Sequence, residues 1–173
     1  MSWGILLVAT CLGIIALTLL AATLSIAPWV PTRRRDLKRI FELADLKEGE
    51  SFYDFGSGTG TLIFSAAKMT KGNPVGVEMS MPLYIFSQIK KYLTRNKKVN
   101  FILKNAHAVD LSKIDVLYIF GMPGRFEKLK AKLKKEAPAG MRLISYAFAL
   151  EGLEPERVDK PSDKDLPIYL YRF

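Results

Sequence analysis

Hydrophobic positions divide the chain into one uninterrupted apolar run and a longer part in which apolar and polar residues alternate. No charged side chain occurs from residue 3 to residue 30, and every Lys, Arg, Asp and Glu follows Thr32. An apolar helix of ~20 residues can cross the hydrocarbon core of a bilayer. We therefore expect residues 1–32 to form an N-terminal transmembrane anchor and residues 33–173 to form one folded domain.

The charges next to the apolar run predict its orientation. Arg33, Arg34 and Arg35 follow the run directly, and nothing basic precedes it. The positive-inside rule then predicts a single-pass membrane protein with its N-terminus outside and its C-terminal domain in the cytoplasm, or on the matrix side in an organelle. A cleaved signal peptide, with Ser25-Ile26-Ala27 resembling a cleavage site, is the alternative, but its basic n-region and short apolar stretch are missing.

Beyond Thr32, amphipathic segments with helical spacing alternate with short, nearly all-apolar segments. The helices are expected at residues 36–46, 61–69, 80–93 and 126–136. The strands are expected at residues 51–55, 75–78, 99–103, 115–120 and 141–150, with a closing pair around 156–159 and 168–171. This alternation predicts an α/β fold with a doubly wound, mostly parallel sheet.

The helix that follows the second strand has recognisable start signals. Ser80 is expected to act as its N-cap, with Pro82 in its first turn. Its large apolar residues recur at helical spacing, so we expect them to form a buried face: Ile85, Phe86, Ile89 and Leu93.

Composition narrows the chemistry that the chain can perform. Cys11 is the only cysteine and His107 the only histidine, so disulfides and Cys-based or multi-histidine metal sites are excluded, and no metal is expected. The formal net charge of +9 favours anionic partners. An anionic lipid surface could meet Arg33–Arg35 and the lysine-rich face of helix 126–136. Nucleic acid is disfavoured because no separate binding domain is present.

A glycine-rich loop between the first strand and the next helix carries the clearest chemical signal. Residues 54–60 read DFGSGTG. Glycines let the backbone approach a ligand, and a helix N-terminus offers N–H groups to an anion. The acidic residue before the glycines can hold an ammonium, and Glu78, which closes the second strand, can accept the hydroxyls of a ribose. A ligand with a carboxylate, an ammonium and an adenosine ribose is S-adenosylmethionine.

The pattern D-x-G-x-G-x-G, followed by an acidic residue that closes strand two, resembles class I S-adenosylmethionine-dependent methyltransferases. More narrowly, the chain resembles the small prokaryotic and mitochondrial protein-lysine methyltransferases, the ATP synthase c-subunit lysine methyltransferase family. The similarity runs from about Val30 to the C-terminus and includes residues 30–32 (VPT), 117–123 (LYIFGMP) and 148–150 (FAL). It implies a Rossmann-like seven-stranded sheet with S-adenosyl-L-methionine as the cofactor.

The resemblance also implies roles for single residues. Asp54 and Gly56 would face the methionine end of the cofactor, Glu78 the ribose, and Asn105 the adenine amino group. The candidate cofactor-binding residues are Thr32, Asp54, Gly56, Ser57, Gly58, Gly60, Glu78 and Asn105. The family often has Asp and Arg where this chain has Thr59 and Thr61.

The methyl acceptor is expected beside the cofactor, over the ends of the fourth and fifth strands. A neutral amine attacks the sulfonium methyl in line, so positioning and exclusion of water can suffice without a dedicated base. Aromatic groups can hold a lysine side chain. The candidate acceptor-pocket residues, taken as the catalytic set, are Phe120, Met122, Pro123, Tyr146 and Phe148.

These features together predict a membrane-anchored methyltransferase that modifies a lysine of a membrane or membrane-proximal protein. A lipid or quinone headgroup is the alternative acceptor, because the anchor explains it equally well. A non-catalytic scaffold that binds S-adenosylmethionine is a further alternative. The expected partners are a protein-lysine acceptor and an anionic lipid surface.

Overall fold

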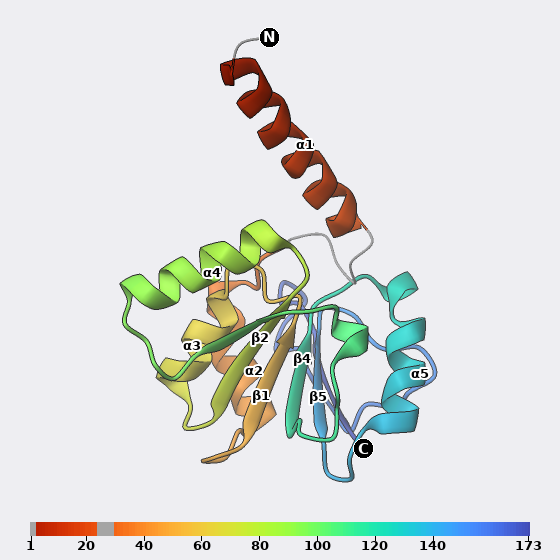
Figure 1. Cartoon of the computed structure of the whole chain (residues 1–173). Coiled ribbons are helices and arrows are strands. Elements are labelled where there is room, and N and C mark those ends of the chain that lie inside the picture. The colour runs from red at the N-terminus through yellow and green to blue at the C-terminus, as the bar shows by residue number, and fades with distance from the viewer. Residues whose placement is uncertain (1–2, 24–29) are drawn as a thin grey trace.

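The computed structural model describes residues 3–23 and 30–173, with the side chains of residues 17–23 excepted. An N-terminal helix, α1 (Trp3–Thr23), leads to an α/β fold (Figure 1). The chain enters this fold through a short 3-10 turn, η1 (Arg34–Asp36).

A seven-stranded sheet forms the centre of the fold. Its strand order is β3-β2-β1-β4-β5-β7-β6, and the neighbours from β3 to β5 run parallel while β7 is antiparallel to β5 and β6. The strands are β1 (Ser51–Phe55), β2 (Asn73–Glu78), β3 (Asn100–Leu103), β4 (Val116–Ile119), β5 (Arg142–Tyr146), β6 (Arg157–Asp159) and β7 (Ile168–Arg172). The predicted Rossmann-like, doubly wound, mostly parallel sheet is confirmed.

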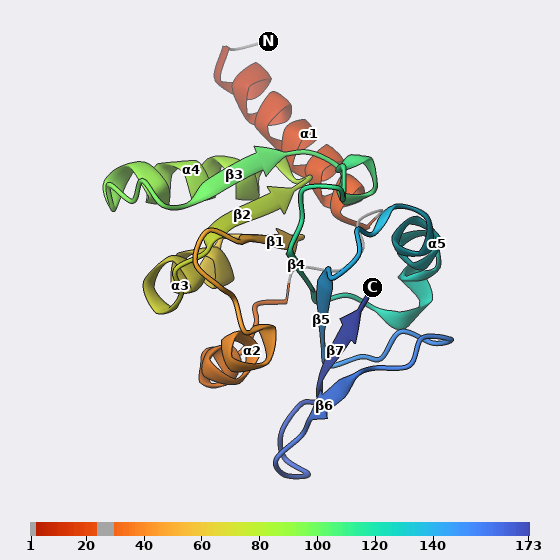
Figure 2. The ribbon, with the colours of Figure 1, turned by 90° about the horizontal axis from the view of Figure 1, so that it is seen from below.

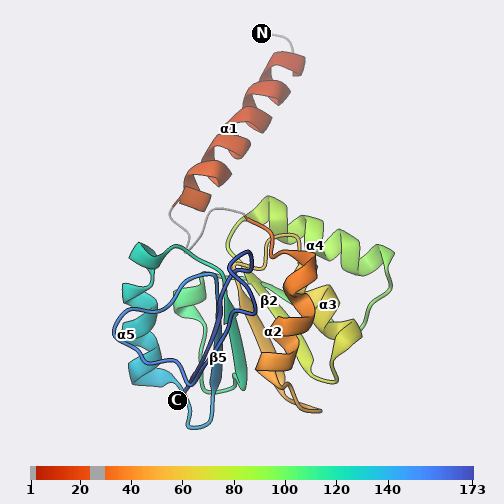
Figure 3. The same cartoon turned by 180° about the vertical axis from the view of Figure 1, so that it is seen from behind.

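Helices cover both faces of the sheet (Figures 2 and 3). On one side lie α2 (Leu37–Ala44), α3 (Thr61–Met69) and α4 (Met81–Leu93), and on the other lies α5 (Glu127–Glu136). Two further 3-10 turns follow strands, η2 (Ala106–Ala108) after β3 and η3 (Pro123–Arg125) after β4. Connections between parallel strands are right-handed as a rule, so the covering helices change face where the strand order reverses between β1 and β4.

Alternate residues of the central strands supply two separate cores. Phe52 and Tyr118 belong to the core on the side of α2 and α3, whereas Phe55 and Leu117 belong to the core under α5. Successive side chains of a strand point to opposite faces, so each strand serves both cores. β4 is buried at every position, as a strand covered on both faces requires.

The fifth strand is shorter than the sequence predicts. It ends at Tyr146, although the apolar residues that follow suggested an extension to residue 150. Ala147 has φ +69°, in the left-handed region, and an extended strand cannot continue through that conformation. The chain therefore turns at Ala147, where its N–H donates to the carbonyl oxygen of Pro167 at 2.9 Å.

The predicted buried face of α4 is wrong. Its large apolar residues are exposed, with Ile85 at 48%, Phe86 and Ile89 each at 53%, and Leu93 at 73%. Ser87 is the only buried residue of the helix, and its hydroxyl lies within hydrogen-bond distance of two carbonyl oxygens, those of Gly58 at 2.9 Å and Leu83 at 3.0 Å. Because this polar side faces the glycine loop, the apolar stripe on the opposite side of the helix points outward.

The start of α4 is also capped differently from the prediction. Ser80 occupies the N-cap position and Pro82 lies in the first turn, as expected, but the Ser80 side chain makes no capping hydrogen bond. The Glu78 carboxylate accepts the N–H groups of Met79 and Ser80 instead, at 2.9 and 2.7 Å. The negative charge that suits this helix end therefore comes from the preceding strand.

The prediction of a single-pass membrane protein, with its N-terminus outside and its domain cytoplasmic, is wrong by this structure. Among the residues that the structure describes, no helix is long and apolar enough to cross a membrane. The alternative cleavage site at residues 25–27 lies outside the described residues.

Candidate active site

The candidate residues gather at one edge of the sheet, because parallel strands end at the same edge. Asp54 lies near the end of β1, Glu78 ends β2 and Tyr146 ends β5. The strand order reverses between β1 and β4, which creates the crevice where ligands bind in folds of this kind. Thr32 reaches the same edge from the N-terminal segment, and its Oγ1 lies 2.8 Å from the hydroxyl oxygen of Tyr118.

The glycine loop has a conformation that only glycine adopts easily. Gly56, Gly58 and Gly60 have φ of +83°, +55° and +73°. A Cβ at Gly60 would lie 2.5 Å from the ring of Phe101, whereas a Cβ at Gly56 would meet nothing within 4 Å. Backbone conformation thus requires all three glycines, and close packing adds a second requirement at Gly60.

Hydrogen bonds hold the loop against the second strand. The N–H groups of Gly56 and Ser57 both donate to the carbonyl oxygen of Val77, at 2.9 and 3.1 Å. The N–H of Gly60 donates to the carbonyl oxygen of Ser57 at 2.8 Å. Several loop N–H groups are therefore already used within the protein, and an anion would be received by the first turn of α3.

Glu78 organises the loop as well as the start of α4. Its Oε2 accepts the N–H of Gly58 at 2.7 Å, and its Oε1 accepts the two N–H groups of the α4 start. The residue is only 7% exposed. An ionised carboxylate has about four acceptor sites, so one site remains for a ligand hydroxyl. Sequence reasoning assigned Glu78 to a ribose and missed its role in holding the loop.

Asp54 is a buried acid without a cationic partner. It is 5% exposed, and the ion pairs of the described part of the chain do not include it. Burial, and secondarily the nearby Glu78, raise the pKa of the Asp54 carboxyl to about 8. A ligand cation beside it would favour the ionised form, so the position suits an ammonium group.

Two further candidate residues have unused polar atoms. Ser57 Oγ is buried and has no hydrogen-bond partner among the described residues. Asn105 is exposed, and its Oδ1 accepts the N–H of His107 at 2.9 Å as the cap of η2. The amide nitrogen of Asn105 and one lone pair of its oxygen remain for a ligand. Both residues fit a polar ligand such as S-adenosylmethionine.

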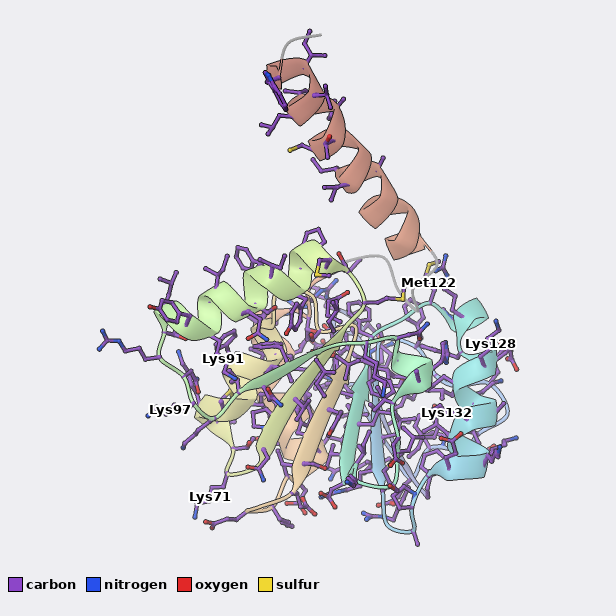
Figure 4. All side chains as sticks on the ribbon, viewed as in Figure 1. Lys71, Lys91, Lys97, Met122, Lys128 and Lys132 are labelled. Atoms are coloured by element: carbon purple, nitrogen blue, oxygen red, sulfur yellow. The ribbon has the colours of Figure 1, made fainter. Side chains whose placement is uncertain are left out.

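The candidate acceptor residues form a buried part and an exposed part. The rings of Phe120 and Tyr146 meet edge to face, with centroids 4.8 Å apart, and Tyr146 is fully buried. Phe148 follows the turn at Ala147 and is 38% exposed. Met122 is 51% exposed and Pro123 is exposed too, and Figure 4 places Met122 at the end of the domain nearest α1.

Asp36 is a buried residue of this edge that sequence reasoning missed. It is 1% exposed and accepts a hydrogen bond from the hydroxyl of Tyr146 at 2.5 Å. Arg39 donates to Asp36 at 3.0 Å and to Asp159 at 2.8 Å. The contact joins residues 110 positions apart, so no local pattern could have revealed it.

The two tyrosines of this edge keep their protons. Burial and the Asp36 hydrogen bond raise the pKa of Tyr146 above its usual value. Burial also raises the pKa of Tyr118 well above its usual value. Both hydroxyls can therefore donate or accept hydrogen bonds, but neither can serve as a base near neutral pH.

Comparisons with known proteins agree with this geometry. The family described as ANTKMT methyltransferase domain matches residues 54–157. A protein-lysine N-methyltransferase of Saccharolobus islandicus is 31% identical over 153 residues, which cover 83% of this chain and 92% of that protein. The ATP synthase c-subunit lysine N-methyltransferase of Homo sapiens is 26% identical over 167 residues, which cover 91% of this chain and 70% of that protein.

A solved structure agrees as well. It is an RNA methyltransferase from Salinibacter ruber in complex with S-adenosyl-L-homocysteine, with a TM-score of 0.76 and 26% identity. The match covers 83% of this chain and 93% of that chain. S-adenosyl-L-methionine is accordingly the cofactor, because S-adenosyl-L-homocysteine is what remains of it after methyl transfer. The chain belongs to the ANTKMT methyltransferase domain family and is an S-adenosylmethionine-dependent methyltransferase.

Proposed function

We propose that the chain binds S-adenosylmethionine at the edge formed by β1 and β2 and methylates a protein lysine that enters over β4 and β5. The observation that carries the proposal is the buried Asp54 carboxyl, which has no cationic partner in the described chain and adjoins the glycine loop. A protein rarely buries an acid alone unless a ligand completes its environment. The ammonium of the methionine group is such a ligand.

The cofactor contacts follow from the polar atoms that remain available. Asp54 would receive the ammonium, and Glu78 would accept a ribose hydroxyl with its remaining acceptor site. The first turn of α3 would receive the carboxylate. Thr32, Gly56, Ser57, Gly58, Gly60 and Asn105 complete the proposed cofactor-binding set.

The acceptor lysine would lie over the ends of β4 and β5, between the buried and the exposed members of the candidate acceptor set. Phe120 would form the wall of the pocket with Tyr146 packed behind it, and Met122, Pro123 and Phe148 would form its rim. When bound, the cofactor would supply an activated methyl group on its sulfonium, and this pocket would hold a neutral lysine nitrogen in line with it. Asp36 would hold the Tyr146 hydroxyl, so that the aromatic wall keeps one orientation.

We further propose that the acceptor lysine belongs to a membrane or membrane-proximal protein. Support comes from the relative of Homo sapiens, whose name gives the c-subunit of ATP synthase as its substrate. That similarity extends over 91% of this chain, so it includes the proposed cofactor site at β1 and β2 and the proposed acceptor site at β4 and β5.

A labelling experiment tests the proposal. The full chain is incubated with S-adenosylmethionine carrying a radioactive methyl group and with cell membranes, which are then separated into protein and lipid. Label is expected in protein, and acid hydrolysis is expected to release it as methyllysine. Glu78→Ala is expected to abolish the label, because the variant loses the acceptor for Gly58 and for the ribose.

A matched control separates the site from the rest of the surface. Glu154→Ala removes an exposed carboxylate and is expected to leave the labelling rate unchanged. Label in lipid alone would refute the lysine acceptor, as would label in another amino acid. Full labelling by the Glu78→Ala variant would show that the cofactor site is elsewhere.

A further inference from the structure

Helix α4 presents its most hydrophobic side chains to the outside of the fold. Its large apolar residues are between 48% and 81% exposed, and we call them the α4 stripe: Met81, Ile85, Phe86, Ile89, Tyr92 and Leu93. They recur three or four positions apart and therefore share one side of the helix. Side chains along α4 project away from the domain in Figure 4. A continuous apolar surface of this kind marks an interaction site, whereas single exposed apolar residues are ordinary.

The segment around the stripe carries only positive charge. Residues 79–109 contain six lysines and arginines and no aspartate or glutamate: Lys90, Lys91, Arg95, Lys97, Lys98 and Lys104. The ion pairs found among the described residues include none of these six. Lys91 and Lys97 lie at one end of α4, on the side toward the sheet (Figure 4). The exposed apolar stripe and these cations, which lack ion-pair partners among the described residues, therefore belong to one continuous segment of the chain.

The lysine-rich face of α5 differs in both respects. Lys130 pairs with Glu127 at 2.7 Å, and Lys132 pairs with Glu136. The apolar residues of α5, Leu129 and Leu133, are buried. The lysine face that the sequence offered for an anionic lipid surface is therefore partly neutralised and lacks an apolar stripe, whereas α4 has both features.

We infer that the α4 stripe rests on an anionic phospholipid surface, with its apolar side chains in the boundary between headgroups and acyl chains. A helix with one exposed apolar side and cations beside it lies in the plane of such a surface without crossing it. The cations would then meet phosphate groups. A second copy of this chain fits less well, because pairing two stripes would bring two uncompensated basic segments together.

The position of α4 connects this surface to the cofactor loop. Ser87 donates to the carbonyl oxygen of Gly58, and the Lys90 ammonium lies 4.4 Å from the centre of the Phe64 ring of α3. The stripe therefore belongs to an element that directly contacts the loop. The inference concerns binding alone and does not rest on the proposed acceptor.

A fluorophore placed on the stripe tests the inference. In the full chain, Cys11→Ser removes the only cysteine and Ile89→Cys allows labelling with an environment-sensitive dye. Met69→Cys is the matched control, since Met69 of α3 is 50% exposed and Ile89 is 53% exposed. Vesicles of phosphatidylcholine with phosphatidylglycerol are compared with vesicles of phosphatidylcholine alone. Retained binding of S-adenosylhomocysteine confirms that both labelled proteins are folded.

The expected result is a blue shift of the dye at position 89, roughly 10 nm or more, as it leaves water for the lipid boundary. The shift is expected with anionic vesicles only, and salt should reduce it. Replacing Lys91, Lys97 and Lys98 by Gln should weaken the apparent affinity on the order of 100-fold, at about 1 kcal/mol for each cation.

Several outcomes would overturn the inference. The first is a dye at position 89 whose emission does not shift with anionic vesicles. The dye reports only its own surroundings, so this result would overturn the inference even if the protein bound the vesicles through α1. Equal shifts at positions 89 and 69, or equal shifts with neutral vesicles, would contradict a specific anionic contact. A shift that grows with protein concentration without vesicles would identify a second copy as the occupant.

Discussion

Helices α3 and α4 each follow a parallel strand and lie on the same side of the sheet, yet they use their apolar residues in opposite ways. α3 buries Leu62, Ile63, Phe64, Ala66 and Ala67, whereas α4 buries only Ser87. The two helices also differ in what they contact at the glycine loop. α3 begins directly after Gly60, and α4 reaches the loop through the hydroxyl of Ser87. One helix is part of the core, whereas the other packs the partly buried Tyr84 against it and turns its large aliphatic residues outward.

Because α3 buries its apolar residues and α4 exposes them, the two helices have different roles. The burial of α3 fixes the position of the loop that holds the cofactor, since its N-terminus begins where the loop ends. α4 leaves its apolar side free for an external surface, at the edge of the sheet next to the short strand β3. Substitutions on the two helices should therefore have very different effects.

The largest effect is expected at the junction of the loop with α3. Gly60→Ala should lower the free energy of unfolding by roughly 2–5 kcal/mol, because the new Cβ adds backbone strain to a collision with Phe101. Urea unfolding followed by circular dichroism measures it. Gly56→Ala is the matched control: it has strain without a collision, so its cost should be only about 1–2 kcal/mol. Equal costs would mean that Phe101 does not constrain the loop.

A pair of truncations compares the two helices directly. Leu62→Ala removes a side chain that is 2% exposed and should cost about 2–5 kcal/mol of unfolding free energy. Ile89→Ala removes a side chain that is 53% exposed and should change the unfolding free energy by less than about 0.5 kcal/mol. Both values come from the same urea titrations. A cost at Ile89 as large as that at Leu62 would show that the α4 stripe is packed inside the protein.

A smaller effect is expected where α4 meets the loop. Ser87→Ala leaves the carbonyl oxygen of Gly58 without its donor, so the unfolding free energy should fall by about 1–2 kcal/mol and S-adenosylhomocysteine should bind more weakly. Ser65→Ala in α3 is the control, because that hydroxyl bonds only to Thr61 of its own helix. If the two variants bind S-adenosylhomocysteine equally well, the contact between α4 and the loop has no role in the site.

Much of the fold could be predicted from periodicity, because each central strand is covered on both faces and reads as a short apolar run. β1 and α3 have the predicted boundaries, and the closing pair β6–β7 lies where the tail suggested. The misplaced end of β5 has a local cause, since an alanine with positive φ carries no sequence signature. The apolar positions of α4 predicted a helix correctly, but periodicity alone does not tell whether an apolar stripe faces the core or the outside.

The candidate site could be predicted where its residues are close in sequence and not where the fold assembles them. The glycine loop and Glu78 were recognised from spacing, and they meet in the structure through Gly58. Asp36 escaped notice because its partner Tyr146 comes from the far end of the chain. The apolar N-terminal run led to a wrong prediction, since hydrophobicity along a sequence does not by itself establish a spanning helix.

Calorimetric titration with S-adenosylhomocysteine between pH 6 and pH 8 tests the central claim most directly, because the claim is that Asp54 holds the cofactor's ammonium. In the free protein the pKa of Asp54 is about 8, so its carboxyl is protonated below that pH and must lose the proton to bind the cation. The affinity should therefore rise by up to about tenfold per pH unit from pH 6 and level off near pH 8. Asp54→Asn should bind more weakly and without this pH dependence. Equal, pH-independent affinities for both proteins would contradict the account.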